Sequence, residues 1–302
     1  MNMTQRRWLL VPVLLVAAMS LGWADPAPVP GPGKDLLQVL PDVLSWIGPA
    51  ATPAPAQPLL KSGDQLAFIG SSMTAFGGWE RLTQYVFKTH YPDLKLTFLI
   101  AGIMGQPSAG MEPRFAKDMK LGQGTTWVFI ETMADVVLAM QGPPDPAGVA
   151  ACAARVAKMV DMGQAAGAQV VLLTDTIIKE DATSEGNQRT LAYVEAIKQV
   201  ATEKHCLLAD LHPLCLAALA AKPAGSFPLT ADNLQMNAYG DAIMAYGIMR
   251  VLGVPDEVVA QTDPLPALRI RSWDLTLVQC AELMEVPVTA FNKPELVRRV
   301  DF

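Results

Sequence analysis

The sequence predicts an α/β fold, a three-layer α/β/α sandwich around a doubly wound sheet of five parallel strands. Apolar, strand-like runs alternate with helix-like segments from about residue 63 to residue 252, the pattern of parallel strands joined by right-handed helical crossovers. Runs such as Val170–Leu173 are apolar on both faces, as strands covered by helices on both sides require. Gly63–Thr74 has the form of a buried strand that enters a tight turn before a helix.

Each element follows from hydrophobic periodicity and from turn residues at its ends. The predicted strands are Gln65–Gly70, Lys95–Ala101, Thr126–Glu131, Gln169–Thr174 and Cys206–Leu211. The predicted helices are Trp79–His90, Gly110–Lys120, Pro146–Ala166, Asn187–Lys204 and Asn237–Leu252. Gly167 ends the third of these helices, as glycine after a periodic run usually does.

The N-terminus has the pattern of a secretory signal peptide over residues 1–24. Arg6 and Arg7 precede an apolar run from Trp8 to Ala18, and small residues at Gly22 and Ala24 suit a cleavage site. The alternative is a retained membrane anchor, although the run is short for a membrane span. We therefore expect export to a periplasm or to the outside of the cell, with no membrane span once the signal is removed.

The mature chain divides into three predicted regions. Residues 25–58 are rich in Pro and Ala and form an arm with one short amphipathic helix near 34–47, which either docks on the domain or binds a partner. Residues 59–254 form the α/β domain. Residues 255–302 are a helical extension, with a polar link over 255–266 followed by helices at Trp273–Met284 and Lys293–Val300.

Composition and charge exclude several function classes. The 302 residues are 51% hydrophobic and carry a net charge of −6, which argues against nucleic-acid binding and against a polybasic membrane patch.

The four cysteines are widely spaced without a zinc pattern, and we favour buried free thiols over a disulfide. No phosphate-loop or dinucleotide motif is present, so no cofactor and no metal is expected. The oligomeric state is not predicted.

Two serines stand at the turn after the first predicted strand. Ser71 and Ser72 follow Gly70 directly, at the edge of the sheet where open α/β folds place their functional sites. They are candidate nucleophiles, and the alternative is that they only cap the next helix.

Four segments together resemble the conserved blocks of the SGNH, or GDSL-type, hydrolases. Phe68–Thr74 (FIGSSMT) is similar to the first block, FIGDSIT, and Ala101–Gly105 is similar to the second, NxGxxG. Trp127–Val136 falls where the third block, GxND, is expected, and Leu229–Gly240 is similar to the last, LTxDGxHxNxxG. Segments between the blocks resemble exported bacterial members of lysophospholipase-like and acetylesterase-like type. The resemblance implies a flavodoxin-like strand order of 2-1-3-4-5.

The resemblance also implies roles for individual residues. Ser72 takes the position of the nucleophile, and Asp232 that of the aspartate that orients the catalytic histidine. The oxyanion donors of the family are the backbone N–H of the serine, here Ser72, that of the second-block glycine, here Gly105, and the third-block asparagine. The implied ligand is a small-molecule or carbohydrate ester, acyl or acetyl.

The departures from the family pattern weaken this catalytic set. Gln235 stands at the histidine position, and an amide cannot accept the serine proton at neutral pH. Ser71 replaces the aspartate of the first block. Either Asp135 or Ala134 takes the asparagine position of the third block, and neither side chain donates a hydrogen bond at neutral pH.

A different histidine is a conceivable substitute for the missing base. His90 and His205 lie at the amino end of the predicted sheet, whereas His212 follows the fifth strand at the carboxyl end, the same edge as Ser72. We hypothesise that His212 reaches the site, the alternative being a residue at a helix start before Pro213.

Two other acidic candidates have structural alternatives. Asp232 either orients a base or caps a helix. Glu131 and Asp135 form either a functional carboxylate pair or an ordinary strand end. Two function classes remain, an exported serine ester hydrolase with impaired catalysis and a non-catalytic relative that binds a ligand or partner.

Overall fold

The computed structural model describes residues 39–48, 58–224, 226 and 228–262. Its strands are β1 (Gln65–Gly70), β2 (Thr97–Gly102), β3 (Trp127–Ile130), β4 (Gln169–Leu173) and β5 (Leu207–Ala209). Its helices up to β4 are α2 (Val39–Ile47), α3 (Ser72–Phe76), α4 (Gly78–His90), η3 (Pro92–Leu94), α5 (Ser108–Met111), η4 (Glu112–Arg114), α6 (Phe115–Asp118), α7 (Met133–Ala139) and α8 (Pro146–Ala165). After β4 come α9 (Glu185–Glu203), α10 (Leu211–Ala221), α11 (Ala238–Val251) and α12 (Asp256–Ala260).

The five strands form one parallel sheet in the order β2-β1-β3-β4-β5. The sequence prediction of a doubly wound α/β sheet with this order is confirmed. The order reverses direction on either side of β1, because β2 lies on one side of it and β3 on the other. Such a switch point brings the carboxyl ends of neighbouring strands to one edge, where loops from both sides meet.

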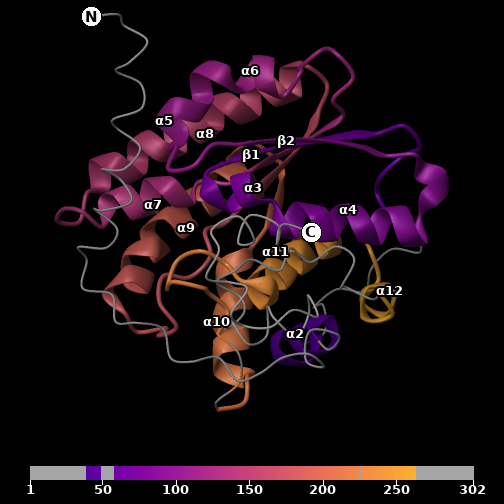
Figure 1. The fold of residues 1–302 in the computed structure, drawn as a ribbon. Coiled ribbons are helices and arrows are strands. Elements are labelled where there is room, and N and C mark those ends of the chain that lie inside the picture. The colour runs from indigo at the N-terminus through magenta and orange to yellow at the C-terminus, as the bar shows by residue number, and fades with distance from the viewer. Residues whose placement is uncertain (1–38, 49–57, 225, 227, 263–302) are drawn as a thin grey trace, which may run out of the picture.

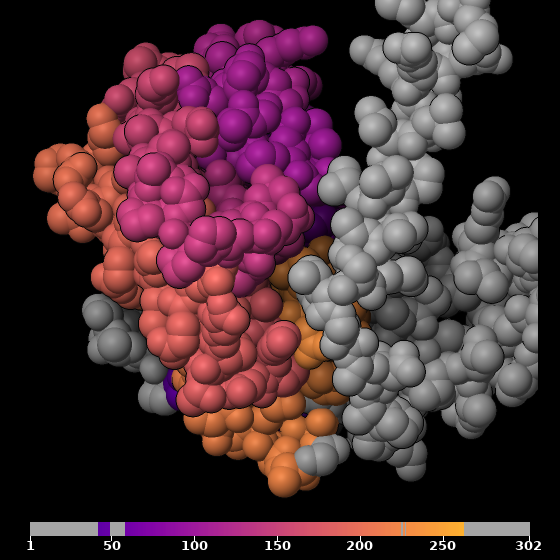
Figure 2. Space-filling view, turned by 90° about the vertical axis from the view of Figure 1, so that its left-hand side faces the viewer, coloured from indigo at the N-terminus to yellow at the C-terminus, as the bar shows by residue number. Residues whose placement is uncertain are grey.

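Helices cover both faces of the sheet (Figure 1). One layer contains α4 and α11, which pack against each other, and the other contains α8 with α5, α6 and α9. From the side, the segments coloured from indigo to orange abut in one continuous body (Figure 2). In this arrangement the central strands β1, β3 and β4 have no face open to solvent, which explains why they are apolar on both faces.

The core is centred on aromatic side chains of β1 and its neighbours. Phe68 is fully buried and stacks on Phe129 of β3 at a centroid distance of 4.6 Å. It also meets the edge of Trp79 from α4 at 5.3 Å. Aromatic pairs in these geometries add roughly 0.5–1.5 kcal/mol each beyond the burial of their area. The strand that leads to Ser72 is therefore among the most firmly packed parts of the molecule.

The structure differs from the predicted elements in several places. The single helix expected at Gly110–Lys120 is three short pieces, α5, η4 and α6. Pro113 lies inside η4, and proline removes a backbone donor and clashes with the preceding helical turn. The fifth strand ends at Ala209 rather than Leu211, because α10 begins at Leu211.

The described residues at the two ends of the chain pack on the α/β domain. Helix α2 packs against α10, α11 and α12, with Val43 fully buried and Trp46 stacked on Tyr239 at 5.3 Å. The helix of the arm thus docks on the domain. Helix α12 lies within the stretch predicted to be a link, where Pro255 precedes its first turn.

Other predictions for the termini lie outside the described residues. These are the signal peptide, most of the Pro- and Ala-rich arm, and the two helices expected after residue 266. In the part of the chain that the structure describes, no helix has the length and apolar character needed to cross a membrane. Cys152 and Cys215 are buried free thiols, as expected, whereas Cys206 is a free thiol that is only half-buried, and Cys280 lies outside the described residues.

Candidate active site

Ser72 is the first residue of α3, at the carboxyl end of β1. The strand ends at Gly70, and Ser71 occupies the position before the helix. Ser71 does not cap α3, because its side chain makes no capping hydrogen bond there. Ser72 is partly buried, and its hydroxyl oxygen is in contact with a side chain 163 residues further along the chain. The predicted nucleophile thus lies where two distant segments meet.

The carboxylate of Glu131, just after β3, holds the turn between β1 and α3. Its Oε2 accepts hydrogen bonds from the backbone N–H of Ser71 at 2.7 Å, the Ser71 hydroxyl at 3.0 Å and the Thr74 hydroxyl at 3.2 Å. Its Oε1 accepts from the N–H of Met133 at 2.5 Å. Burial raises the pKa of the Glu131 carboxyl, while the hydrogen bonds from Ser71, Met133 and Thr74 act in the opposite direction.

Gly70 permits this close approach. A Cβ atom at residue 70 would lie 2.1 Å from Thr74 Oγ1 and 2.4 Å from Glu131 Oε2, far inside van der Waals contact. The first block of the resembled family places an acid at position 71, but here the acid arrives from β3 and Ser71 supplies the hydroxyl. The turn is therefore held by Glu131, for which the sequence suggested a carboxylate pair or an ordinary strand end and not this contact with Ser71.

The loop between α10 and α11 brings Gln235 to Ser72. Gln235 Nε2 donates a hydrogen bond to Ser72 Oγ at 2.9 Å, while Gln235 Oε1 is buried without a partner among the described residues. The loop is a narrow turn, closed by an antiparallel bridge between Thr230 and Met236. Asp232 Oδ1 accepts from the N–H of Gln235 at 2.6 Å and the N–H of Leu234 at 3.1 Å.

Asp232 therefore shapes its own turn. It is exposed, and it does not cap α11, because the side chain of Asn237 occupies that position. Asp232 and Gln235 keep the three-residue spacing of an aspartate and the base that it orients. The structure thus brings Ser72, Asp232 and Gln235 into one site, with an amide where a base is required.

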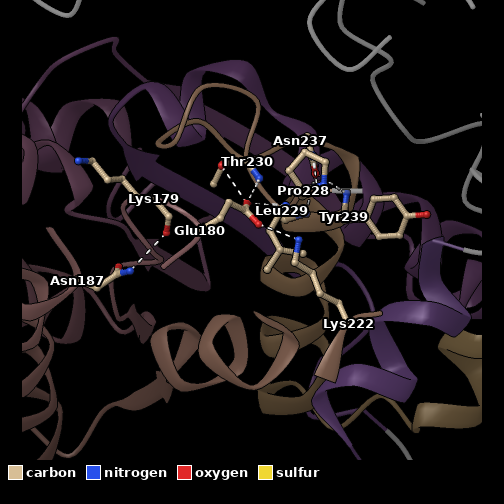
Figure 3. A network of polar contacts seen from close by, with 10 residues as sticks. Lys179, Glu180, Asn187, Lys222, Pro228, Leu229, Thr230, Asn237 and Tyr239 are labelled. Atoms are coloured by element: carbon tan, nitrogen blue, oxygen red, sulfur yellow. Dashed lines mark hydrogen bonds and ion pairs between the residues drawn. The ribbon is translucent and has the colours of Figure 1, made fainter. Parts of the chain in front are cut away.

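Glu180, in the loop after β4, clamps the base of the Gln235 loop (Figure 3). Its Oε1 accepts from the N–H groups of Leu229 at 2.6 Å and Thr230 at 2.8 Å, and from the Thr230 hydroxyl at 3.0 Å. Its Oε2 pairs with Lys222 Nζ at 3.0 Å. The side chain of Asn187 supports the Glu180 segment by accepting from Ile178 N–H and donating to the carbonyl of Asp181.

Gly105 lies in the loop that follows β2, next to the nucleophile turn. The N–H of Ile103 donates to the carbonyl of Gly70 at 3.0 Å, which ties this loop to the end of β1. Gly105 is exposed and has a φ of +67°, a conformation that suits glycine. A Cβ at Gly102 would lie 2.1 Å from the backbone nitrogen of Ala75 in α3, so β2 and the nucleophile helix are in close contact.

Asp135 lies on the first turn of α7 and is already engaged. Its carboxylate accepts from the backbone N–H of Ser108 at 2.6 Å and from the Ser108 hydroxyl at 2.7 Å. Those contacts fix the start of α5 and add no donor near Ser72. Glu131 and Asp135 bind different partners, and neither hydrogen bonds to the other.

His212 does not reach Ser72. The ring is buried, and its Nδ1 lies 2.7 Å from the carbonyl oxygen of Thr176. Because a carbonyl only accepts, Nδ1 carries the proton, and Nε2 has no hydrogen-bond partner among the described residues. His212 instead stands on the first turn of α10, where its backbone N–H donates to Thr174. His212 is therefore a residue at a helix start, which was the alternative, and it does not act as a base for the site.

Asp175 is a buried acid beside the site that the sequence placed only at a strand end. Its Oδ1 accepts from the Thr132 hydroxyl at 3.3 Å, and its Oδ2 has no partner among the described residues. Burial raises the pKa of Asp175 well above its ordinary value, and the negative charges of Glu131 and Asp135 raise it further. The only available signal was a polar residue directly after an apolar strand.

A metal centre does not form from the described residues, since no three His, Cys, Asp or Glu side chains among them are grouped to hold an ion. The site is therefore a serine with polar neighbours. Its hydroxyl lies beside an amide donor, and the N–H of Ser72 has no acceptor among the described residues. That arrangement suits the carbonyl group of an ester better than it suits proton removal.

Comparisons with known proteins agree with this geometry. Residues 68–243 match a family described as the GDSL-like lipase/acylhydrolase family. A search among curated proteins gave no significant match.

Several solved structures share the fold. An α/β hydrolase from the metagenome of Lake Arreo, Spain, is 19% identical with a TM-score of 0.57, and covers 65% of this chain and 97% of its own. An acetylxylan esterase from Geobacillus stearothermophilus is 21% identical with a TM-score of 0.57, and covers 64% of this chain and 96% of its own. Variants of that esterase with a serine, an aspartate or a histidine replaced by alanine are described as catalytic mutants.

Proposed function

This chain belongs to the GDSL-like lipase/acylhydrolase family, and from that premise we propose that it binds acyl or acetyl esters, including esters of carbohydrate, at Ser72 with impaired turnover. The single observation that carries the proposal is the hydrogen bond of 2.9 Å from Gln235 Nε2 to Ser72 Oγ. The site is assembled in the geometry that serves ester hydrolysis, but the group in contact with the serine is a donor. A serine needs a neighbouring base to become nucleophilic.

The reaction is expected to be slow because the serine proton has no acceptor. Attack of Ser72 Oγ on an ester carbonyl transfers the hydroxyl proton to a base, and an amide has none of the required basicity. Loss of one member of a Ser-His-Asp set leaves only about 10³–10⁴-fold acceleration over water. A missing oxyanion donor costs about another 10²–10³-fold, and Asp135, engaged with Ser108, supplies no such donor.

Acetylated carbohydrate is the ligand that we favour within the ester class. The similarity to a solved acetylxylan esterase supports it, although that similarity of 21% identity reaches the fold only. In that esterase the mutated aspartate and histidine are numbered three residues apart, the spacing of Asp232 and Gln235 here.

The alternative is a protein that binds its ligand and does not convert it. The observation that favours it is the same contact, because the Ser72 oxygen already accepts from an amide and no described basic side chain is in contact with the hydroxyl. Binding of an acetylated xylo-oligosaccharide without its hydrolysis, measured by calorimetry with product analysis, distinguishes this alternative.

The decisive experiment compares wild type with Ser72→Ala in the hydrolysis of p-nitrophenyl acetate. An exposed serine outside the site, Ser62, provides the matched control as Ser62→Ala. We expect all three proteins to differ by less than about threefold, because little of the background rate passes through Ser72. Robust turnover that disappears only in Ser72→Ala would overturn the proposal of impaired catalysis.

We also propose that the protein is exported, on the basis of the basic residues and apolar run within residues 1–24. Mass spectrometry of protein recovered from the medium or periplasm provides the test. A mature chain that begins at Asp25 is expected, and a chain that stays intact in the cytoplasm would contradict the proposal.

A further inference from the structure

Strand β2 forms one edge of the sheet. Among the described residues it pairs with β1 on one side and with no strand on the other. The N–H of Thr97 donates to Asp64 and the N–H of Ile103 donates to Gly70, so the odd-numbered residues of β2 point their backbone groups at β1. In a strand the direction alternates, and the N–H and C=O groups of Phe98, Ile100 and Gly102 therefore point outward. No described residue hydrogen bonds to them.

The residues of β2 itself lack the usual protection against strand pairing, and two charged side chains border them: the exposed Lys95, two residues before the strand, and Arg114, which donates to the Ala101 carbonyl. Natural edge strands carry lysine, proline, bulges or inward-facing charges that prevent association. The segment 96–105, with the sequence Leu-Thr-Phe-Leu-Ile-Ala-Gly-Ile-Met-Gly, contains no charge and no proline. Its exposed side chains are also apolar, since Ile100, Ile103 and Met104 are 42%, 44% and 58% exposed. These three make up half of the large apolar residues that the structure describes as exposed.

We propose that a second copy of this chain pairs with the edge, β2 against β2 and antiparallel, about a two-fold axis at Ile100. In this register Ile100 lies opposite Ile100 of the second copy, and Phe98 lies opposite Gly102. All three residues are those with outward backbone groups, so each pair exchanges both of its hydrogen bonds. The two sheets become one continuous sheet across the axis, and the interface is isologous, as the commonest homodimers are.

The side chains of the edge and the net charge of the protein are compatible with pairing between two copies of the chain. The register sets Thr97, the first residue of β2, opposite Ile103, which directly follows the strand, so an exposed apolar group of one copy meets an uncharged group of the other. A chain with a net charge of −6 repels its own copy at long range. The uncharged edge is a place where two copies can meet without opposing carboxylates. Dimer formation is therefore expected to strengthen as salt screens the repulsion.

The proposed interface borders the candidate site but does not depend on the proposed function. Met104 precedes Gly105, and the Ile103 N–H is bonded to Gly70 beside the nucleophile turn. The second copy would thus place its Thr97 next to the loop that follows β2 and is bonded to Gly70. Association would persist in Ser72→Ala, whose hydroxyl takes no part in it.

The test is the oligomeric state of the full chain, as secreted by its expression host, measured by sedimentation over micromolar concentrations. Wild type is expected to dimerise. Ile100→Lys should weaken the dimer by about tenfold or more, because two lysines would then face each other across the axis. The control is Leu138→Lys on α7, whose leucine is 41% exposed, and it should leave the dimer intact.

Two further measurements keep the proposal falsifiable if Ile100→Lys folds poorly. Ile100→Cys should form an intermolecular disulfide on mild oxidation, since opposed residues of an antiparallel pair lie within disulfide reach, whereas Leu138→Cys should not exceed the wild-type background. A wild-type monomer at all concentrations would overturn the proposal. Hydrogen exchange on such a monomer would then show the reason: slow exchange of the amides of Phe98, Ile100 and Gly102 would mean that another segment of the same chain covers the edge.

Discussion

Ser72 is held from two sides that differ in burial and in the reach of their hydrogen bonds. On one side the nucleophile turn is buried, and the Glu131 carboxylate joins Ser71, Thr74 and Met133 across some 60 residues of sequence. On the other side the Gln235 loop is half-exposed, and Asp232 bonds only to its own turn. Glu180 supports that loop from a partly exposed position.

The difference shows which part of the site carries its chemistry. The buried side fixes where the serine lies, through the hydrogen bonds of Glu131 to Ser71 and Thr74. Under the proposed function, the exposed side decides whether the serine loses its proton, through the single side chain of Gln235. A site of that kind would keep its geometry on both sides and lose its reactivity on one.

The largest expected effect comes from restoring a base. Gln235→His should raise Ser72-dependent hydrolysis of p-nitrophenyl acetate by about 10²-fold or more, because a general base contributes about 10²–10⁴-fold. The imidazole would meet the Ser72 oxygen that Gln235 now contacts, with Asp232 three residues before it. The rate should rise with pH through about 6.5, the ordinary pKa of histidine.

Two controls accompany this variant. Gln235→His combined with Ser72→Ala should return to the background rate, and Gln235→Asn, which keeps an amide, should gain nothing. A Gln235→His protein that folds but stays at background would show that the nucleophile turn is also unfit for catalysis.

The next effect concerns the buried side. Glu131→Ala should lower the free energy of unfolding by about 2–4 kcal/mol, because it leaves the buried donors of Ser71, Thr74 and Met133 without an acceptor at about 1–3 kcal/mol each, offset in part by the relief of a buried carboxylate. Urea unfolding measures it. The control is Glu195→Ala, whose side chain is 70% exposed and should change stability by no more than about 0.5 kcal/mol. If the two variants were equally stable, the claim that the buried side of the site contributes more to stability would be wrong.

A smaller effect is expected at the clamp of the Gln235 loop. Glu180→Ala should cost about 1–2 kcal/mol of stability, because water can replace part of its contacts where the side chain is 23% exposed. In the Gln235→His background it should also lower kcat by about tenfold, since the loop that carries the base loosens. A loss of stability as large as that of Glu131→Ala would contradict the stated difference in burial.

The last effect is a pH dependence on the buried side. Burial and the charges of Glu131 and Asp135 raise the pKa of Asp175 in the folded state, so the folded protein binds this proton more tightly than the unfolded chain does. Stability from Asp175 is thus full below its ordinary pKa and is lost as pH rises through the raised value. Asp175→Asn should match wild type near pH 4 and exceed it near pH 8 in urea unfolding. A wild-type advantage that grows with pH would show the opposite sign.

Much of the fold could be predicted, because parallel strands and their crossovers leave local patterns. The strand at Gln65–Gly70 and the helix at Pro146–Ala166 agree with β1 and α8 within one residue. The short pieces α5, η4 and α6 could not be told from one helix by periodicity alone, although Pro113 marked the break. α10 was anticipated only as the helix-start alternative for His212, because the predicted fifth strand ran on to Leu211.

The site was less accessible to sequence reasoning, because its contacts are distant in the chain. Ser72 and Gln235 could be placed together only through the resemblance to known blocks. Glu131 can accept from four donors only because β1 and β3 pair in one particular register. No local sequence pattern determines that register. Asp135 shows the limit of a motif, since its position suggested an oxyanion role and its side chain instead fixes Ser108.

Helix α2 sets the extent of the unit that can stand alone. The family match spans residues 68–243, but Val43 of α2 is fully buried, and Leu59 N–H bonds to the Leu252 carbonyl beyond the other end of the match. A protein truncated to the matched residues would lack α2, and the surfaces of the domain that Val43 and Trp46 cover would therefore be exposed to water. Anyone who trims this chain for crystals or assays should keep residues 39–262 together.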